Sequence, residues 1–284
     1  MSFELSIENQ RGEVLSLTND PDYAIGQIDG LNPPTASIST SKRIGFDGED
    51  IQSVYVNSRT ISIYVYLFGD VEAARLRLYR YVRIKQYLKI HFRNYQRDVY
   101  AEGRVQDIQI DHFAQNQVAQ IVVYCPYPYF KDILSITDGG SQVIDAFSFA
   151  FSCNDGDHFA FGTFMEIPEI VSLNNGEIVS GMQFVFKMNG NVKNPKIFNR
   201  ATGEFFALNY EFQAGDVGTI STHFGSKYAR LLRNAETVNI FNAVTPASVW
   251  LQLDIGDNVF VFEADEGQDM IELSIIHTDE FEGV

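Results

Sequence analysis

Alternation of apolar and polar residues runs through the chain and predicts β-strands. In residues 60–67, branched apolar side chains alternate with hydroxyl-bearing ones, and the same period of two recurs in residues 146–153, 182–188 and 271–275. Successive side chains of a strand point to opposite sides, so this period indicates strands with one buried face. Less regular apolar runs predict further strands at about residues 88–92, 99–110 and 118–124.

Turn-forming pairs divide the second half of the chain at intervals of roughly ten residues, a spacing typical of antiparallel β-sandwiches and jelly rolls. We therefore predict that residues 133–284 form a single β-sandwich. The pairs include Asp138-Gly139, Asp155-Gly156, Asn175-Gly176, Asn189-Gly190 and Thr202-Gly203.

One helix is predicted, beginning after Gly69 and ending near Ile84. Asp70 is suited to cap its first turn. Glu72 lies in the same turn, where the positive end of the helix dipole favours an acidic residue. With a sheet on one side, this helix gives the first domain an α+β arrangement within a mainly β chain. The helix has an apolar stripe of Val71, Ala74, Leu78, Tyr81 and Val82, and Arg77, Arg80 and Arg83 are expected on the opposite side.

A domain boundary is predicted near Asp132. Pro126 and Pro128 end the apolar strand that precedes it, since proline cannot donate to a sheet ladder. Charge also changes there: residues 1–132 have 14 Lys+Arg and 16 Asp+Glu, a net charge of −2, and residues 133–284 have 7 and 21, a net charge of −14. The predicted domains are therefore residues 1–132 and 133–284, each long enough to bury its own core.

Composition narrows the class of protein. A hydrophobic content of 45% is that of a globular chain, and no apolar run approaches the ~20 residues needed to cross a bilayer, so no membrane insertion is expected. The first residues lack an apolar segment, which predicts folding in a cytoplasm. Cys125 and Cys153 are the only cysteines and indicate no disulfide framework. The acidic second half argues against direct nucleic-acid binding.

Residues 73–97 contain eight basic residues and no acidic residue. Three interpretations remain open: a solvated helix face, a nucleic-acid patch, or an interface at which these cations meet carboxylates of a neighbouring subunit. Arginine is enriched at protein interfaces. We therefore place Arg77, Arg80 and Arg83 at or near a subunit junction as a hypothesis.

No catalytic residue, cofactor or metal ligand is predicted. The five histidines are at least 21 positions apart, and no nucleophile-elbow motif occurs. Asp155 to Glu166 has the length of a calcium loop, but Phe159 and Ala160 occupy positions where a ligand and a glycine are required. Acidic pairs such as Asp254 and Asp257 are expected by chance in so acidic a sandwich.

The order and spacing of several motifs resemble the distal tail protein (Dit) of siphophages, a phage tail-component family. In the first half they are residues 59–83, 103–108 and 125–130. In the second half they are residues 194–204, 214–216, 221–225, 248–250 and 256–258.

This resemblance implies a structural hub at the virion tail tip, with no catalytic residues. The first domain would form a belt-like hexameric ring, as a sheet or barrel with one helix, and the second would be a galectin-like sandwich. The implied partners are other copies of the chain, the tail tube protein, the tail-tip protein, and the tape-measure and receptor-binding proteins. A closed ring is physically consistent with many strands, since it leaves few free sheet edges.

Two other functions remain as alternatives. The acidic sandwich could be a carbohydrate-binding, lectin-like protein, or paired carboxylates could make a cell-wall glycosidase. Native mass separates a ring scaffold from a free lectin, and loss of turbidity of bacterial walls would reveal a glycosidase.

Overall fold

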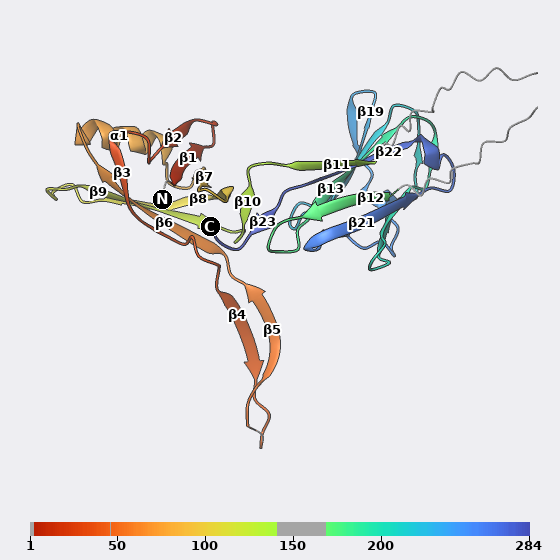
Figure 1. Cartoon of the computed structure of the whole chain (residues 1–284), viewed down its shortest axis with the longest axis horizontal. Helices are drawn as coiled ribbons and strands as arrows, with labels where there is room; N and C mark the ends of the chain where they lie inside the picture. The colour runs from red at the N-terminus through yellow and green to blue at the C-terminus, as the bar shows by residue number, and fades with distance from the viewer. Residues whose placement is uncertain (1–2, 46, 141–168) are drawn as a thin grey trace, which may run out of the picture. The chain divides into compact units, whose positions relative to one another are not determined.

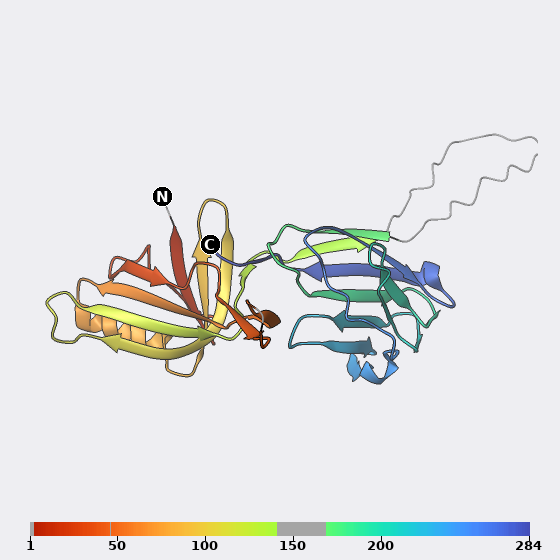
Figure 2. The same ribbon diagram turned by 90° about the horizontal axis from the view of Figure 1, so that it is seen from below.

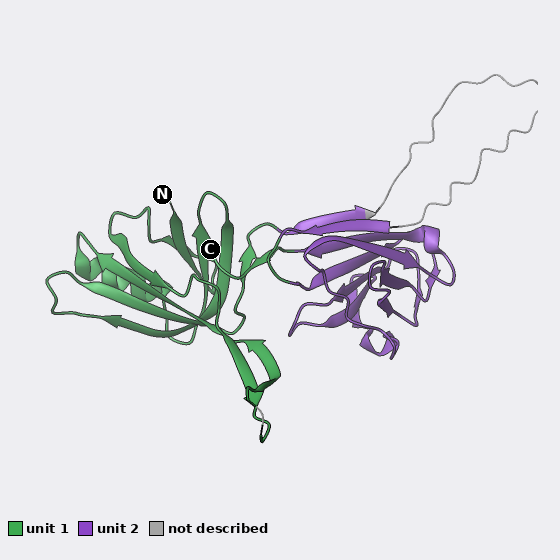
Figure 3. Cartoon of the chain, turned by 60° about the horizontal axis from the view of Figure 1, so that its bottom comes forward, with its two compact units in different colours: residues 1–134, 176–178, 278–284 green, residues 135–175, 179–277 purple. Residues whose placement is uncertain are grey.

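The computed structural model describes residues 3–45, 47–140 and 169–284 of the chain. These residues form two compact units, neither of which is continuous in sequence (Figure 3). The first unit comprises residues 1–134, 176–178 and 278–284, and the second comprises residues 135–175 and 179–277. The division into domains at residue 132 remains a prediction. The final residues of the chain, 278–284, belong to the first unit and not to the second.

A nine-stranded antiparallel sheet makes up most of the first unit. Its two outermost strands on the main path, β2 and β3, do not pair with each other, so of the two predicted forms the structure has an open sheet and not a closed barrel. β10 (Phe130–Asp132) pairs with both β8 and the C-terminal β23 (Glu280–Phe281). The main path is β2 (Val14–Ser16), β1 (Glu4–Asn9), β7 (Tyr87–Arg93), β8 (Asp98–Ile110), β9 (Val118–Cys125), β6 (Arg59–Leu67) and β3 (Tyr23–Asp29).

The one α-helix among the described residues, α1 (Val71–Tyr81), covers one face of this sheet (Figure 2). The predicted cap is confirmed, because the Asp70 carboxylate accepts a hydrogen bond from the Ala73 amide at 3.1 Å. The predicted apolar stripe is also confirmed: Ala74, Leu78 and Val82 are buried in the core of the first unit. This core includes the inward residues of β6, which are fully buried, as the alternation predicted.

A two-stranded ribbon, β4 (Ala36–Ser41) and β5 (Asp50–Val56), extends the line of β3 and β6 (Figure 1). The ribbon is a separate sheet, in which β4 pairs only with β5. No residue of the ribbon belongs to the buried core of the first unit. We refer to residues 36–56 as the arm.

The second unit contains two facing antiparallel sheets with a common apolar core, which is the predicted β-sandwich. Phe184 and Phe260, from opposite sheets, meet with ring centroids 5.5 Å apart. A galectin-like form remains a prediction. The six-stranded sheet is β11 (Ile136–Gly140), β22 (Ile271–His277), β13 (Met182–Met188), β18 (Val217–Ser221), β19 (Tyr228–Arg233) and β20 (Glu236–Asn239). The four-stranded sheet is β12 (Glu169–Asn174), β21 (Gly256–Glu263), β15 (Lys196–Asn199) and β16 (Phe205–Ala207).

Short elements complete the second unit: β14 (Val192–Lys193) pairs with β17 (Glu211–Phe212), and η1 (Phe241–Ala243) and η2 (Gln268–Met270) are single 3-10 turns. The mainly β fold class with one helix is confirmed. The strand predicted at residues 146–153, Cys153 and the calcium-like stretch beginning at Asp155 lie outside the described residues.

Candidate subunit interface

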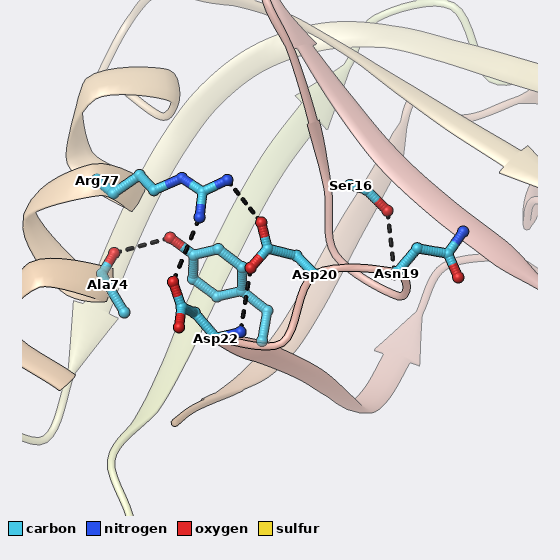
Figure 4. Close-up of polar contacts among 7 residues, drawn as sticks. Ser16, Asn19, Asp20, Asp22, Ala74 and Arg77 are labelled. Carbon is cyan, nitrogen blue, oxygen red and sulfur yellow. Dashed lines mark hydrogen bonds and ion pairs between the residues drawn. The ribbon is translucent and has the colours of Figure 1, made fainter. Parts of the chain in front are cut away.

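Arg77 is paired within its own chain (Figure 4). Its guanidinium contacts Asp20 at 2.5 Å and Asp22 at 3.4 Å, both in the segment before β3, and lies over the Tyr23 ring at 5.6 Å from the centroid. Position 77 therefore does not stand free on the far side of the helix. It lies at the edge of the buried stripe, where it ties α1 to the segment between β2 and β3.

Tyr23 completes this link between α1 and β3. Its hydroxyl donates a hydrogen bond to the Ala74 carbonyl at 2.8 Å, and burial raises the pKa of Tyr23 to about 12. The hydroxyl therefore stays protonated and able to donate at neutral pH. Together with Arg77 it fixes the helix on the sheet.

Arg80 and Arg83 are exposed, and neither forms an ion pair with another residue in the described part of the chain. They differ in this from Arg77, although the helical spacing of the sequence predicts the same side of the helix for all three. The hypothesis that all three lie at a subunit junction remains a prediction. Of the three residues, Arg80 and Arg83 are those whose charges are available to a second molecule.

The arm has one apolar side and one polar side, because each cross-strand pair of an antiparallel ribbon shares a face. Ile38 pairs with Val54 and Thr40 with Ile51 on one side, and Ser39 pairs with Ser53 on the other. A bulge between Ser39 and Thr40 keeps this separation to the end of the ribbon. The apolar side consists of Ala36, Ile38, Thr40, Ile51, Val54 and Val56, and the polar side of Ser37, Ser39, Ser41, Asp50, Ser53 and Tyr55.

The apolar side of the arm is open to solvent. Ile38 is 58% exposed, Ile51 65% and Val54 59%. An isolated two-stranded ribbon is marginally stable in water, and a contiguous exposed apolar patch marks an interaction surface in soluble proteins. The arm is therefore the strongest candidate for an assembly surface in the described part of the first unit.

Reasoning from the sequence missed the arm, although a signal for it was present. Residues 36–41 alternate small or apolar residues with three serines, which is the period of a strand, and residues 50–56 carry three branched apolar residues. Gly45 and Gly48 between them supply a turn. The pattern is weak because serine, threonine and alanine differ little in hydrophobicity, and a strand is recognised by the contrast between apolar and polar positions.

Other kinds of site find little support in the described residues. No three His, Cys, Asp or Glu side chains among them lie close enough together to hold a metal ion. No helix that the structure describes has the length and apolar character required to cross a bilayer. Burial raises the pKa of the Cys125 thiol to about 11, so this cysteine is protonated and unreactive at neutral pH.

Residues 175–280 match the family described as the siphovirus-type tail component, C-terminal domain. No curated protein matches the sequence of the chain. Among solved structures, Dit (gp 19.1) of phage SPP1, described as a paradigm of the hub adsorption apparatus in Gram-positive infecting phages, has a TM-score of 0.71 and 14% sequence identity, covering 99% of this chain and 100% of that one.

Two structures of the phage P2 baseplate in its activated conformation also contain a similar chain. The structure with Ca has a TM-score of 0.53 and the one with Sr a TM-score of 0.52, each at 12% identity and each covering 98% of both chains. At these identities the likeness is one of fold. In fold over its whole length, and in sequence over residues 175–280, the chain is similar to siphophage tail components, which confirms the resemblance to distal tail proteins predicted from the sequence.

Proposed function

We propose that this protein is the structural hub of a phage tail tip. In this proposal the first unit forms a hexameric ring at the end of the tail tube. The ring joins the tail tube protein to the tail-tip protein and gives attachment to tape-measure and receptor-binding proteins. The likeness in fold to a hub protein over nearly the full length of both chains supports this role, and the exposed apolar side of the arm supports the ring.

The arm is the element that would build the ring. Closed cyclic symmetry repeats one heterologous contact, so each copy needs a projecting surface and a separate receiving surface. A ribbon that leaves the sheet and presents an apolar face suits the projecting role. Its receiving surface would be on the adjacent copy, where a sheet or helix face can cover Ile38, Ile51 and Val54.

The expected contribution of the arm is large enough to matter. Complete burial of one such side chain is worth about 1.5–3 kcal/mol, and each of the three is more than half exposed in the single chain. Covering them would therefore add roughly 1 kcal/mol or more per side chain at each junction. Because the junction recurs around a ring, a moderate contact at each one stabilises the whole assembly.

Charge placed on the apolar side of the arm tests this role. We expect the double variant Ile38→Glu, Val54→Glu to remain monomeric in native mass spectrometry, whereas the parent chain forms rings. Two carboxylates would have to be buried at each junction, which costs several kcal/mol per charge. At dilutions where the parent is also monomeric, the thermal unfolding midpoints of the two should be nearly the same, since both side chains are exposed in the single chain.

The matched control is Ser39→Glu, Ser53→Glu. It puts the same pair of charges across the same ribbon, one position along, on the polar side. The cross-strand repulsion is of similar size in the two variants, and the main difference between them is the face that carries the charges. Rings formed equally well by both double variants would rule out the apolar side of the arm as the contact. A parent chain that stays monomeric at every concentration, alone and with its tail partners, would overturn the ring itself.

A further inference from the structure

A buried arginine lies at the point where the arm leaves the sheet. Arg59 is the first residue of β6, follows closely on β5, and is 4% exposed. Its guanidinium donates hydrogen bonds to the carbonyl oxygens of Pro128 at 2.6 Å, Gly30 at 2.6 Å and Asn32 at 3.0 Å, and to that of Glu282. Four backbone carbonyls from three separate segments thus converge on one side chain.

No carboxylate in the described residues forms an ion pair with Arg59. The guanidinium instead lies over the Phe130 ring, 4.3 Å from its centroid. A buried charge is tolerated only when its donors are satisfied, and here carbonyl dipoles and an aromatic face do so. An arginine that served packing alone could be replaced by an apolar residue. The convergence of three backbone segments indicates a positional role.

One of the three segments is the root of the arm, residues 30–35. Gly30 has φ +92°, and a Cβ there would lie 2.2 Å from the Thr60 carbonyl oxygen, so only glycine fits where β3 ends and the root begins. The other side of the root is closed by the hydrogen bond from the Asn57 amide to the Thr35 carbonyl at 3.0 Å. Arg59 thus binds the root through the Gly30 and Asn32 carbonyls, between the end of β3 and the start of the arm.

A second segment is the C-terminal one, residues 278–284, which we call the strap. The Val284 amide donates to the Leu31 carbonyl at 3.2 Å, and a Cβ on Gly283 would come within 3.1 Å of Pro33, so the strap lies directly against the root. Phe281 pairs with Phe130 of β10. Arg97 also contacts the strap: it donates a hydrogen bond to the Gly283 carbonyl and forms an ion pair with Glu177.

We propose that Arg59 is a positioning residue that, together with the strap, fixes the root of the arm and holds the arm ready for the adjacent copy. The arm has no core of its own, so its direction is set only at its root. A segment held in its bound geometry loses less conformational freedom on association, which strengthens binding without any new contact. The inference rests on the arm being the ring contact, but the positional role can be measured apart from ring formation.

The measurement is hydrogen exchange in the Ile38→Glu, Val54→Glu background, where no ring is expected. We expect Arg59→Met to speed exchange by about tenfold or more at the Asn57 and Val284 amides, which donate to the root carbonyls of Thr35 and Leu31, because charge-assisted hydrogen bonds to the root are lost. Exchange in the central strands β8 and β9 should stay unchanged. Arg59→Lys, which keeps the charge but only part of the hydrogen-bond geometry, should give partial rescue.

Arg97→Gln provides a second, milder variant that loosens the strap from a partly exposed position. It should speed exchange at the root in the same direction as Arg59→Met and by a smaller factor. Unchanged exchange at the root in both variants would overturn the proposal. So would an equal rise throughout the sheet, which is the result expected of an arginine that only stabilises the fold.

In the parent sequence, Arg59→Met should weaken ring association by about tenfold, a factor that corresponds to the loss of one such hydrogen bond. If root exchange responds as expected but the parent chain forms no ring, the positional role stands and the proposed function fails. If rings form and Arg59→Met leaves both root exchange and association unchanged, the positional role fails alone.

Discussion

At the scale of single residues, helical periodicity places Arg77 on α1 but cannot identify its partners. Asp20 and Asp22 are more than fifty positions away in the sequence, and they meet Arg77 only because β3 brings the preceding segment under the helix. Arg80, one turn further, meets no such segment. Periodicity therefore predicted which residues are buried, while the division of the arginines into paired and available ones required the fold.

Glu280 is a buried acid whose role the sequence did not indicate. It is 3% exposed in β23, accepts a hydrogen bond from the Tyr127 hydroxyl, and lies beside Lys131. Burial raises the pKa of Glu280 above its ordinary value, while the Tyr127 hydrogen bond and the Lys131 charge lower it in part. The nearby hydroxyls of Tyr100 and Tyr129 titrate far above neutral pH, since burial raises the pKa of each.

This raised pKa predicts a pH-dependent stability of the first unit. Between the ordinary pKa of 4.5 and the raised folded value, the folded state holds a proton that the unfolded state has lost. The free energy of unfolding therefore falls as pH rises through this window. Glu280→Gln removes the charge and keeps an acceptor for Tyr127, so it should match the parent below the window and be more stable above it.

Urea unfolding of both proteins from about pH 4 to about pH 8 measures the difference. Glu236→Gln, on the exposed edge strand β20, is the control and should leave the pH dependence unaltered. Identical pH dependence in the parent and in Glu280→Gln would show that Glu280 is ionised at no cost in the folded protein.

At the scale of elements, the strongly alternating strands that fall within the described residues are present as predicted, and strands with weak contrast, such as β4 and β5, were missed. β6, β13 and β22 each have one buried side and one mainly polar, less buried side, which is the pattern that a period of two detects. The helix ends at Tyr81, three residues before its predicted end, because Val82 takes an extended conformation and Lys85 has φ +69°. No glycine or proline marks that stop.

The cap of α1 gives a prediction for this element. Asp70→Ala should lower the free energy of unfolding of the first unit by about 1 kcal/mol, because the Ala73 amide loses its acceptor and the helix dipole loses a favourable charge. Asp70→Ser, which keeps a capping oxygen, should recover most of the loss. Urea unfolding measures both variants. A loss of the same size in Asp70→Ser would assign the effect to something other than the cap.

At the scale of the whole molecule, local pattern could not reveal that the chain returns to the first unit. The prolines and the charge change near residue 132 mark where the first unit is left, and residues 133 and 134 still belong to it. The strap and residues 176–178 are short and have no distinctive composition. They belong to the first unit through pairings such as Lys131 with Glu280, across about 150 positions of sequence, and only the assembled fold shows such pairings.

The charges of the molecule allow the basic residues at the end of α1 and just after it, Arg80 and Arg83, to be tested as a second part of the proposed ring junction. Arg80 and Arg83 have no partner among the described residues, and the other copies of the chain are strongly acidic, with a net charge of −16 each. We expect the double variant Arg80→Glu, Arg83→Glu to weaken ring association by about 1–2 kcal/mol per junction, since exposed charge pairs are worth up to about 1 kcal/mol each. Arg77 is left unchanged, because its reversal would repel Asp20 and Asp22 within the chain.

Mass photometry over a dilution series measures this effect, and salt provides an internal check. If the arginines meet carboxylates of the adjacent copy, added salt should weaken the parent ring and narrow its difference from the variant, because exposed charges are screened. Arg11→Glu, Arg230→Glu changes the net charge equally at two other exposed positions and is the control. A ring weakened equally by both double variants responds to net charge alone, and a ring unaffected by reversal at positions 80 and 83 leaves the arm as the sole proposed contact.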